Sequence, residues 1–135
     1  MEADKKKERF LSYAQQIKDL GFRVFYSSRS LDNFFFYGFI VNNNDEIGTF
    51  SLCEDGNSLC FSTKHKYCTD FGDGFLLDNS FEGQTEITKS IVERCFKHHA
   101  EWVKSNKWSN PYMIRKWNAS EFFKQYWDKD NIREL

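Results

Sequence analysis

Long apolar runs are absent from this chain of 135 residues, and no stretch approaches the roughly 18 apolar residues that cross a bilayer. The charged segment at residues 1–7 has no apolar segment after it, so we expect no secretory signal. The four cysteines are too few for a dense disulfide scaffold, and we expect free thiols. These absences exclude a membrane-spanning helix and predict a cytoplasmic protein.

A metal-binding framework is also missing. Cys53, Cys60, His65 and Cys68 offer thiolate and imidazole groups, which are the ligands that zinc prefers. Their spacing matches no paired C-x2-C arrangement, and the two strand cysteines would have to face one pocket. We therefore expect no metal and no cofactor, and we interpret these residues as thiols and an imidazole without a shared ion.

Signatures of nucleotide binding and of catalysis are equally scarce. The segment Phe71-Gly72-Asp73-Gly74-Phe75 lacks the glycine spacing of a dinucleotide loop and the lysine of a P-loop, and its aspartate would repel phosphate. Thr63 and His65 would share one face of a strand, but no oxyanion-hole motif or nucleophile elbow accompanies them. We expect a protein that is not an enzyme, and a small enzyme centred on His65 is kept as an alternative.

Aromatic residues are abundant. They make up 19% of the chain, and phenylalanine alone occurs fifteen times. Because each buried ring removes a large apolar area from water, we expect a core built on phenylalanine in a single domain spanning residues 1–135. Part of the aromatic excess would also suit the surface of a homodimer.

The order of apolar patterns predicts the fold class. Helical spacing covers residues 4–20 and again about 85–104, and Asn118-Ala119-Ser120-Glu121 has the spacing of a capping box before a last short helix. Between the first two helices lie four strand-like segments, at residues 22–26, 33–41, 47–53 and 59–63, with residues 66–83 as a long loop. We predict an α+β domain: a four-stranded antiparallel meander with an N-terminal helix and two or three C-terminal helices packed on it.

Charge is unevenly spread along the chain. Residues 31–87 contain ten acidic residues against two lysines, whereas residues 94–117 contain six basic residues against one acid. In this basic region Trp108, Arg115, Lys116 and Trp117 interleave cations with rings, as a protein that stacks on bases and contacts phosphates would. A nucleic-acid or nucleotide-binding module is therefore an alternative, although the net charge of −1 for the whole chain lacks the basic footprint of a general nucleic-acid binder.

The candidate contact surface lies between Cys53 and Phe75, where hydroxyls, an imidazole, thiols, aspartates and glycines gather after a β-hairpin. We expect the acidic sheet side and the 62–75 segment to bind a partner. The exposed polar members of this surface would be Thr63, His65, Asp70 and Asp73.

The stretch Phe61-Ser62-Thr63-Lys64-His65-Lys66, followed by Gly72-Asp73-Gly74-Phe75, resembles small uncharacterised proteins of phages and plasmids that carry an S-T-x-H-K segment and a G-x-G-F turn. The likeness covers about fifteen residues, and the chain departs from the pattern at Tyr67 and Asp73. The resemblance implies an accessory protein of a mobile element that binds a host protein or protein–nucleic acid complex, such as an inhibitor of a defence complex of the anti-CRISPR kind.

Overall fold

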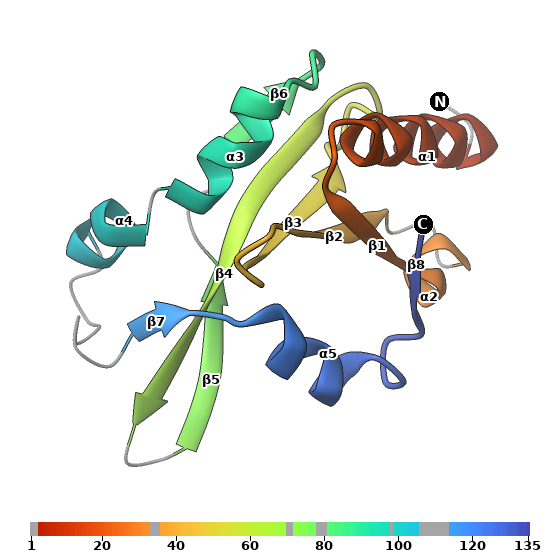
Figure 1. Cartoon of the computed structure of the whole chain (residues 1–135). Coiled ribbons are helices and arrows are strands. Elements are labelled where there is room, and N and C mark those ends of the chain that lie inside the picture. The colour runs from red at the N-terminus through yellow and green to blue at the C-terminus, as the bar shows by residue number, and fades with distance from the viewer. Residues whose placement is uncertain (1–2, 33–35, 70–71, 78–80, 98, 106–113) are drawn as a thin grey trace.

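The computed structural model describes residues 3–32, 36–69, 72–77, 81–97, 99–105 and 114–135. Within them, an antiparallel sheet carries helices on both faces, which confirms the α+β class (Figure 1). The helices are α1 (Ala3–Asp19), α2 (Ser28–Asp32), α3 (Lys89–Lys97), α4 (His99–Ser105) and α5 (Ala119–Tyr126). The strands are β1 (Arg23–Ser27), β2 (Tyr37–Val41), β3 (Ile47–Leu52), β4 (Leu59–Thr69), β5 (Gly72–Leu77), β6 (Phe81–Gln84), β7 (Ile114–Lys116) and β8 (Ile132–Glu134).

The predicted meander forms the middle of the sheet. Strands β1 to β4 follow one another as antiparallel neighbours, and the register places Phe39 of β2 beside Phe25 of β1 and Thr49 of β3. Three of these four strands begin within one residue of the predicted start; β2 is described from Tyr37, and residues 33–35 of the predicted strand lie outside the described residues. Alternating large apolar side chains thus placed the central strands correctly.

The prediction of four strands was wrong, because the sheet has eight among the described residues. The difference arises mainly from β4, which continues past Thr63 to Thr69. The second half of β4 pairs with β5 on one side and with β7 on the other. Residues 66–83 are therefore not one long loop. Glycine and aspartate are depleted in strands, so their frequency here concealed the hairpin of β4 and β5, and β7 adds a pairing partner that is distant in the sequence.

The C-terminal helices also differ from the prediction. One helix was expected over about residues 85–104, but the structure has two in this part of the chain, α3 and α4, and the first begins only at Lys89. The hydroxyl of Thr88 accepts a hydrogen bond from the Ile91 amide, so α3 begins after Thr88. Among the described residues, no helix combines the length and the apolar character that a bilayer crossing requires.

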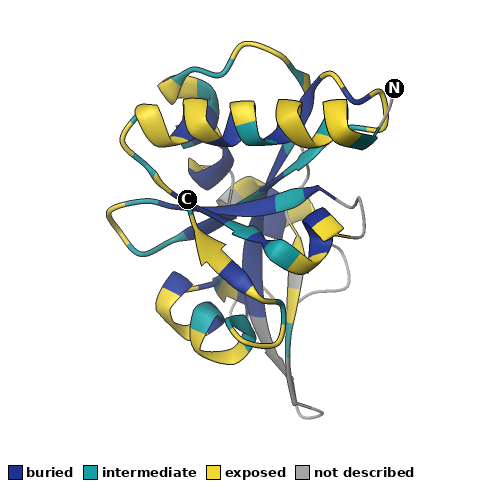
Figure 2. Ribbon diagram, turned by 90° about the vertical axis from the view of Figure 1, so that its right-hand side faces the viewer, coloured by how far each residue is buried: buried dark blue, intermediate teal, exposed yellow. Residues whose placement is uncertain are grey.

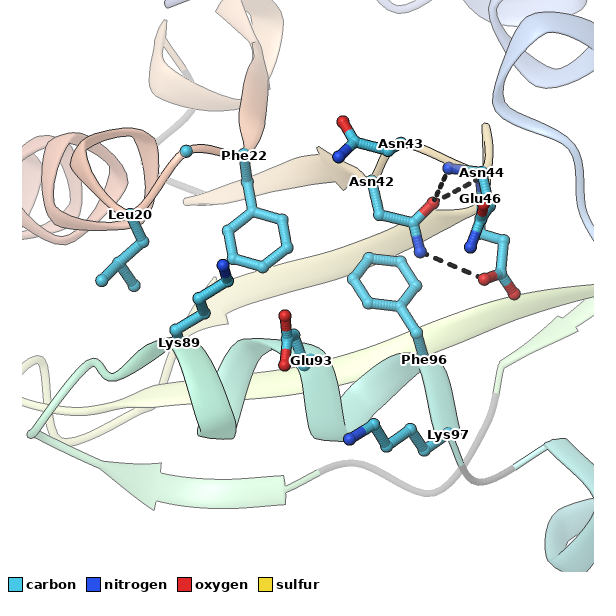
Figure 3. A pocket seen from close by; sticks show the side chains of 11 residues that line it. Leu20, Phe22, Asn42, Asn43, Asn44, Glu46, Lys89, Glu93, Phe96 and Lys97 are labelled. Carbon is cyan, nitrogen blue, oxygen red and sulfur yellow. Dashed lines mark hydrogen bonds between the residues drawn. The ribbon is translucent and has the colours of Figure 1, made fainter.

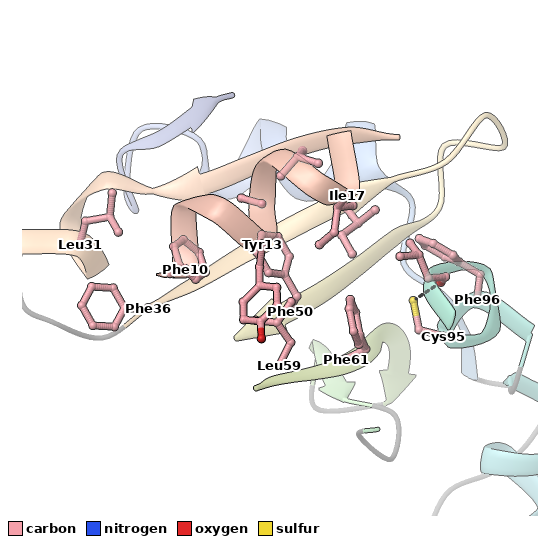
Figure 4. Packing of buried hydrophobic residues seen from close by; sticks show 14 residues of the cluster. Phe10, Tyr13, Ile17, Leu31, Phe36, Phe50, Leu59, Phe61, Cys95 and Phe96 are labelled. Atoms are coloured by element: carbon pink, nitrogen blue, oxygen red, sulfur yellow. Dashed lines mark hydrogen bonds between the residues drawn. The ribbon is translucent and has the colours of Figure 1, made fainter. Parts of the chain in front are cut away.

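Two hydrophobic clusters lie on opposite faces of the sheet. The α1 and α3 face contains Phe10 and Ile17 of α1 packed on Phe50 of β3 (Figure 4). The other face contains Phe39 of β2 packed against Phe122 of α5. Figure 2 shows that the central strands are largely buried, whereas the outer faces of α1 and α5 are largely exposed. The central strands are covered by helices on both sides, which explains why their sequences are apolar at consecutive positions.

Candidate ligand-binding site

Two residues of the predicted contact surface are buried in the core. The hydroxyl of Thr63, 1% exposed, donates a hydrogen bond to the carbonyl oxygen of Cys95. His65 is fully buried, and its ring stacks on Trp102 with the ring centroids 4.4 Å apart. The expectation that Thr63 and His65 are exposed was wrong, because both point from β4 toward the α3 and α4 side.

The other two residues of the predicted contact surface are Asp70 and Asp73. Asp70 lies outside the described residues. Asp73 lies in β5 and is paired by register with Cys68 of β4. The structure thus gives no surface on which the four predicted contact residues come together.

The predicted nucleic-acid surface is not assembled as expected either. Trp108 lies outside the described residues, and Trp117 is only 3% exposed, so its ring is not available to stack on a base. The ammonium group of Lys116 forms an ion pair with Glu46 at 2.7 Å and donates to the carbonyl oxygen of Phe96. Arg115 alone of these residues is both described and exposed.

Cys60 and His65 do not converge, and the side chain of Cys68 lies outside the described ones. Cys60 and His65 are five positions apart on β4, so they point to opposite faces of the strand. Cys60 instead contacts Cys53, with the two sulfur atoms 3.0 Å apart. Burial and the neighbouring Cys53 thiol raise the pKa of Cys60 to about 12, which keeps this sulfur protonated.

A different residue of the same segment, Lys64, occupies the most unusual position in the described structure. Its neighbours Thr63 and His65 face α3 and α4, so alternation along β4 directs Lys64 to the α5 face. The residue is only 7% exposed, and among the described residues none forms a hydrogen bond or an ion pair with its ammonium group. A buried lysine without a paired carboxylate is rare in proteins, because removing an ammonium group from water is unfavourable.

Aromatic rings surround the Lys64 ammonium group. The Nζ atom lies 4.1 Å from the ring centroid of Phe75, 4.8 Å from that of Phe122 and 5.8 Å from that of Phe39. Cation–π attraction offsets part of the lost hydration. Burial still lowers the pKa of Lys64 to about 8, and the carboxylate of Asp130 opposes this effect only in part.

Beside Lys64 lies a hollow of about 510 Å³, between strands β2 to β5 and helix α5. We call it the Lys64 pocket; its walls include Tyr37, Phe39, Phe75, Phe122 and Tyr126, with Asp130 at one side. Phe75 and Leu77, which are 40% and 51% exposed, are the only large apolar side chains exposed among the described residues, and both line this pocket. Figure 1 shows the two elements that enclose it, with α5 on one side and the β4–β5 hairpin on the other.

Polar groups in the Lys64 pocket are few. The hydroxyl groups of Thr49 and Ser62, on adjacent strands, are hydrogen-bonded to each other. Asp130 is fixed through its backbone, because its carbonyl oxygen accepts a hydrogen bond from the Ser27 hydroxyl at 2.9 Å. An apolar cavity of this size with a few convergent polar groups is typical of a small-molecule site.

A second hollow, of about 440 Å³, lies between the end of α1, α3 and the β2–β3 turn (Figure 3). It is lined by charges of both signs, including Lys89 and Glu93. The amide group of Asn42 donates to Glu46 and its carbonyl oxygen accepts from the turn backbone, so its polar groups are satisfied within the protein. This hollow therefore lacks the unpaired buried charge that distinguishes the Lys64 pocket.

Sequence reasoning missed Lys64 because it ended the strand at Thr63 and assigned the following residues to a loop. The available signal was the alternation of Ser62, Lys64 and Lys66 with the residues that face the core. Had the strand been extended, two lysines would have been expected on one face of a long central strand.

Compared with protein-family models, with curated proteins and with solved structures, the chain matches none of them.

Proposed function

We propose that this chain is a binding protein and that the Lys64 pocket holds its ligand, a small molecule with an apolar body. One observation carries the proposal: the two exposed large apolar side chains of the described structure, Phe75 and Leu77, both line a hollow of about 510 Å³ whose wall also includes buried and half-buried aromatic rings. Soluble domains generally keep such side chains scattered, and their grouping at a cavity marks a binding site.

The pocket is built on strands and a helix, and this supports the same proposal. Its floor is formed by the hydrogen-bonded strands β2, β3 and β4, whose register is continuous. Its other sides come from α5 and from β5, which pairs with β4 through six residues. A site built on strands and a helix is held in a fixed geometry, which lowers the entropy lost when a ligand binds.

The proposal is tested with N-phenylnaphthylamine, a neutral fluorescent dye whose emission rises in apolar surroundings. We expect saturable binding to the wild-type chain, and weaker binding by about tenfold in Phe75→Ser, because the substitution removes a ring wall. Phe81→Ser is the matched control: Phe81 is also a partly buried strand phenylalanine, but it lies on β6 against Arg94. Equal weakening in both variants, or binding that does not saturate, would contradict the proposal.

The expectation of a mobile-element accessory protein that inhibits or modulates a host complex stays a prediction from the sequence. It requires a contact surface other than Thr63 and His65, since both are buried. The nucleic-acid alternative likewise requires a surface that does not depend on Trp117.

A further inference from the structure

We infer that the ligand of the Lys64 pocket is a monocarboxylic acid with an aromatic body, whose carboxylate pairs with the Lys64 ammonium group inside the pocket. This inference rests on the proposed function and adds the chemical class of the ligand.

The first step compares the ion-pair partner of Lys64 with those of the neighbouring lysines. Lys66 lies two positions along the same face of β4, and its Nζ atom is 3.5 Å from the carboxylate of Glu121. Lys116 on the adjacent β7 pairs with Glu46 at 2.7 Å. Lys64 is as deeply buried as Lys66, yet no described residue is bonded to its ammonium group. The missing carboxylate is the group that a ligand would supply.

The second step concerns the number of negative charges. The Lys64 pocket offers one ammonium group together with hydroxyl groups that include those of Thr49 and Ser62, and it contains the carboxylate of Asp130. A single cation suits a single negative charge, whereas phosphate groups are generally held by several cations or by backbone amides. Asp130 would repel a second negative charge. The pocket therefore favours a monoanion.

The third step concerns the body of the ligand. The walls are mainly rings, and they already interact with each other edge to face or stacked: Phe122 stacks on Tyr126 at 4.8 Å and Phe39 packs on Phe122 at 5.2 Å. Phe75 at the opening stands edge-on to Tyr126 at 6.2 Å. Another aromatic ring can enter such a set in the same geometries, which contribute beyond the burial of area alone.

The test compares naphthoic acid with naphthamide, which have the same shape and differ in charge. Isothermal titration at pH 7 should show that the wild-type chain binds the acid at least tenfold more tightly than the amide, since an ion pair shielded from water is worth that ratio or more. Lys64→Met should abolish the preference, so that acid and amide bind with similar affinity. Lys66→Met is the matched control and should keep the preference, because Lys66 does not line the pocket.

A measurement on the wild-type chain alone gives the same information without a substitution. The affinity for the acid should decline as the pH rises above about 8, where unliganded Lys64 loses its proton, while the affinity for the amide stays level. The other titratable groups that line the pocket are Tyr37 on β2, Tyr126 on α5 and Asp130 after α5, and Lys64→Met retains all three, so the same titration on that variant isolates the part that Lys64 causes.

The outcomes distinguish a failure of the carboxylate inference from a failure of the proposed function. Equal affinity of the wild-type chain for acid and amide, or a preference that survives in Lys64→Met, overturns the carboxylate inference and leaves the pocket as a site for neutral ligands. If the neutral dye fails to bind as well, the proposed function itself is wrong.

Discussion

At the scale of single residues, Lys64 is the most unusual feature of the described structure. The ammonium group is held among three rings in the part of the molecule that ordinarily excludes charge. Such a residue lowers the stability of the fold, and this is why we propose that it pairs with a ligand. Thr63 and His65, which the sequence singled out, serve instead to pack β4 against α3 and α4.

The stability cost of Lys64 gives a prediction with a definite sign. Its pKa is about 8 in the folded protein against 10.5 for an ordinary lysine, so between these values the unfolded chain binds more protons. The free energy of unfolding therefore rises with pH over this range, and the penalty is fully present below about pH 8. The shift corresponds to roughly 3 kcal/mol, of which the rings already offset a part.

We accordingly expect Lys64→Met to be more stable than the wild-type chain at pH 7, by roughly 1–3 kcal/mol. At pH 10 the difference should be clearly smaller, because the wild-type lysine is then largely neutral in the folded protein. Urea unfolding of both chains at the two pH values measures this, and groups other than Lys64 cancel in the comparison. A difference that does not change with pH would mean that Lys64 is not the titrating residue.

At the scale of secondary-structure elements, the sequence predicted those elements whose own apolar pattern is visible and missed those that depend on pairing with other strands. Helices α1 and α5 and the strands β1 to β4 were found because their side chains repeat with a local period. Strands β7 and β8 have three residues each, too few for a period to be visible, and β5 begins Gly72-Asp73-Gly74. β7 and β8 exist because partners distant in the sequence pair with them. β5 instead pairs with its hairpin neighbour β4, but its glycines and aspartate obscure the strand pattern, so the wall that it contributes to the Lys64 pocket was not predicted.

The start of α5 shows a local signal that was confirmed. The predicted capping spacing is present, with the side-chain oxygen of Asn118 accepting a hydrogen bond from the Glu121 amide at 3.2 Å. Asp45 adds a second tie, since its carbonyl oxygen accepts from the Ala119 amide at 2.7 Å. This end of α5 is thus fixed both by its own cap and by the β2–β3 turn.

We expect Asn118→Ala to lower the free energy of unfolding by about 1 kcal/mol, which is the usual value of a helix N-cap. Asn118→Asp should retain most of the stability, because a carboxylate accepts the same hydrogen bond and also interacts favourably with the start of a helix. Urea denaturation monitored by circular dichroism provides the measurement. If the two variants are equally unstable, the side chain matters for another contact and not as a cap.

At the scale of the whole molecule, one sheet separates two cores, and the Lys64 pocket lies in only one of them. The strands β1 and β2 contribute to both cores, since Val24 and Ile40 face α1 while Phe25 and Phe39 face α5. Damage to either core should therefore propagate through the strands they share. This coupling would make the domain that the sequence predicted unfold as one unit.

Phe10→Ala tests the coupling from the side opposite to the pocket. Phe10 on α1 is fully buried and stacks on Phe50 at 5.2 Å, so the substitution should lower the free energy of unfolding by about 3–5 kcal/mol. Trp102 lies in α4, whereas Trp117 lies in the α5 core; since the chain has four tryptophans, each signal is isolated in a variant that keeps only that one and has phenylalanine at the other three. Both signals should move to the same lower urea midpoint in the Phe10→Ala background. If the Trp117 signal kept its original midpoint, the two cores would unfold independently, and the Lys64 pocket would survive the loss of the α1 side.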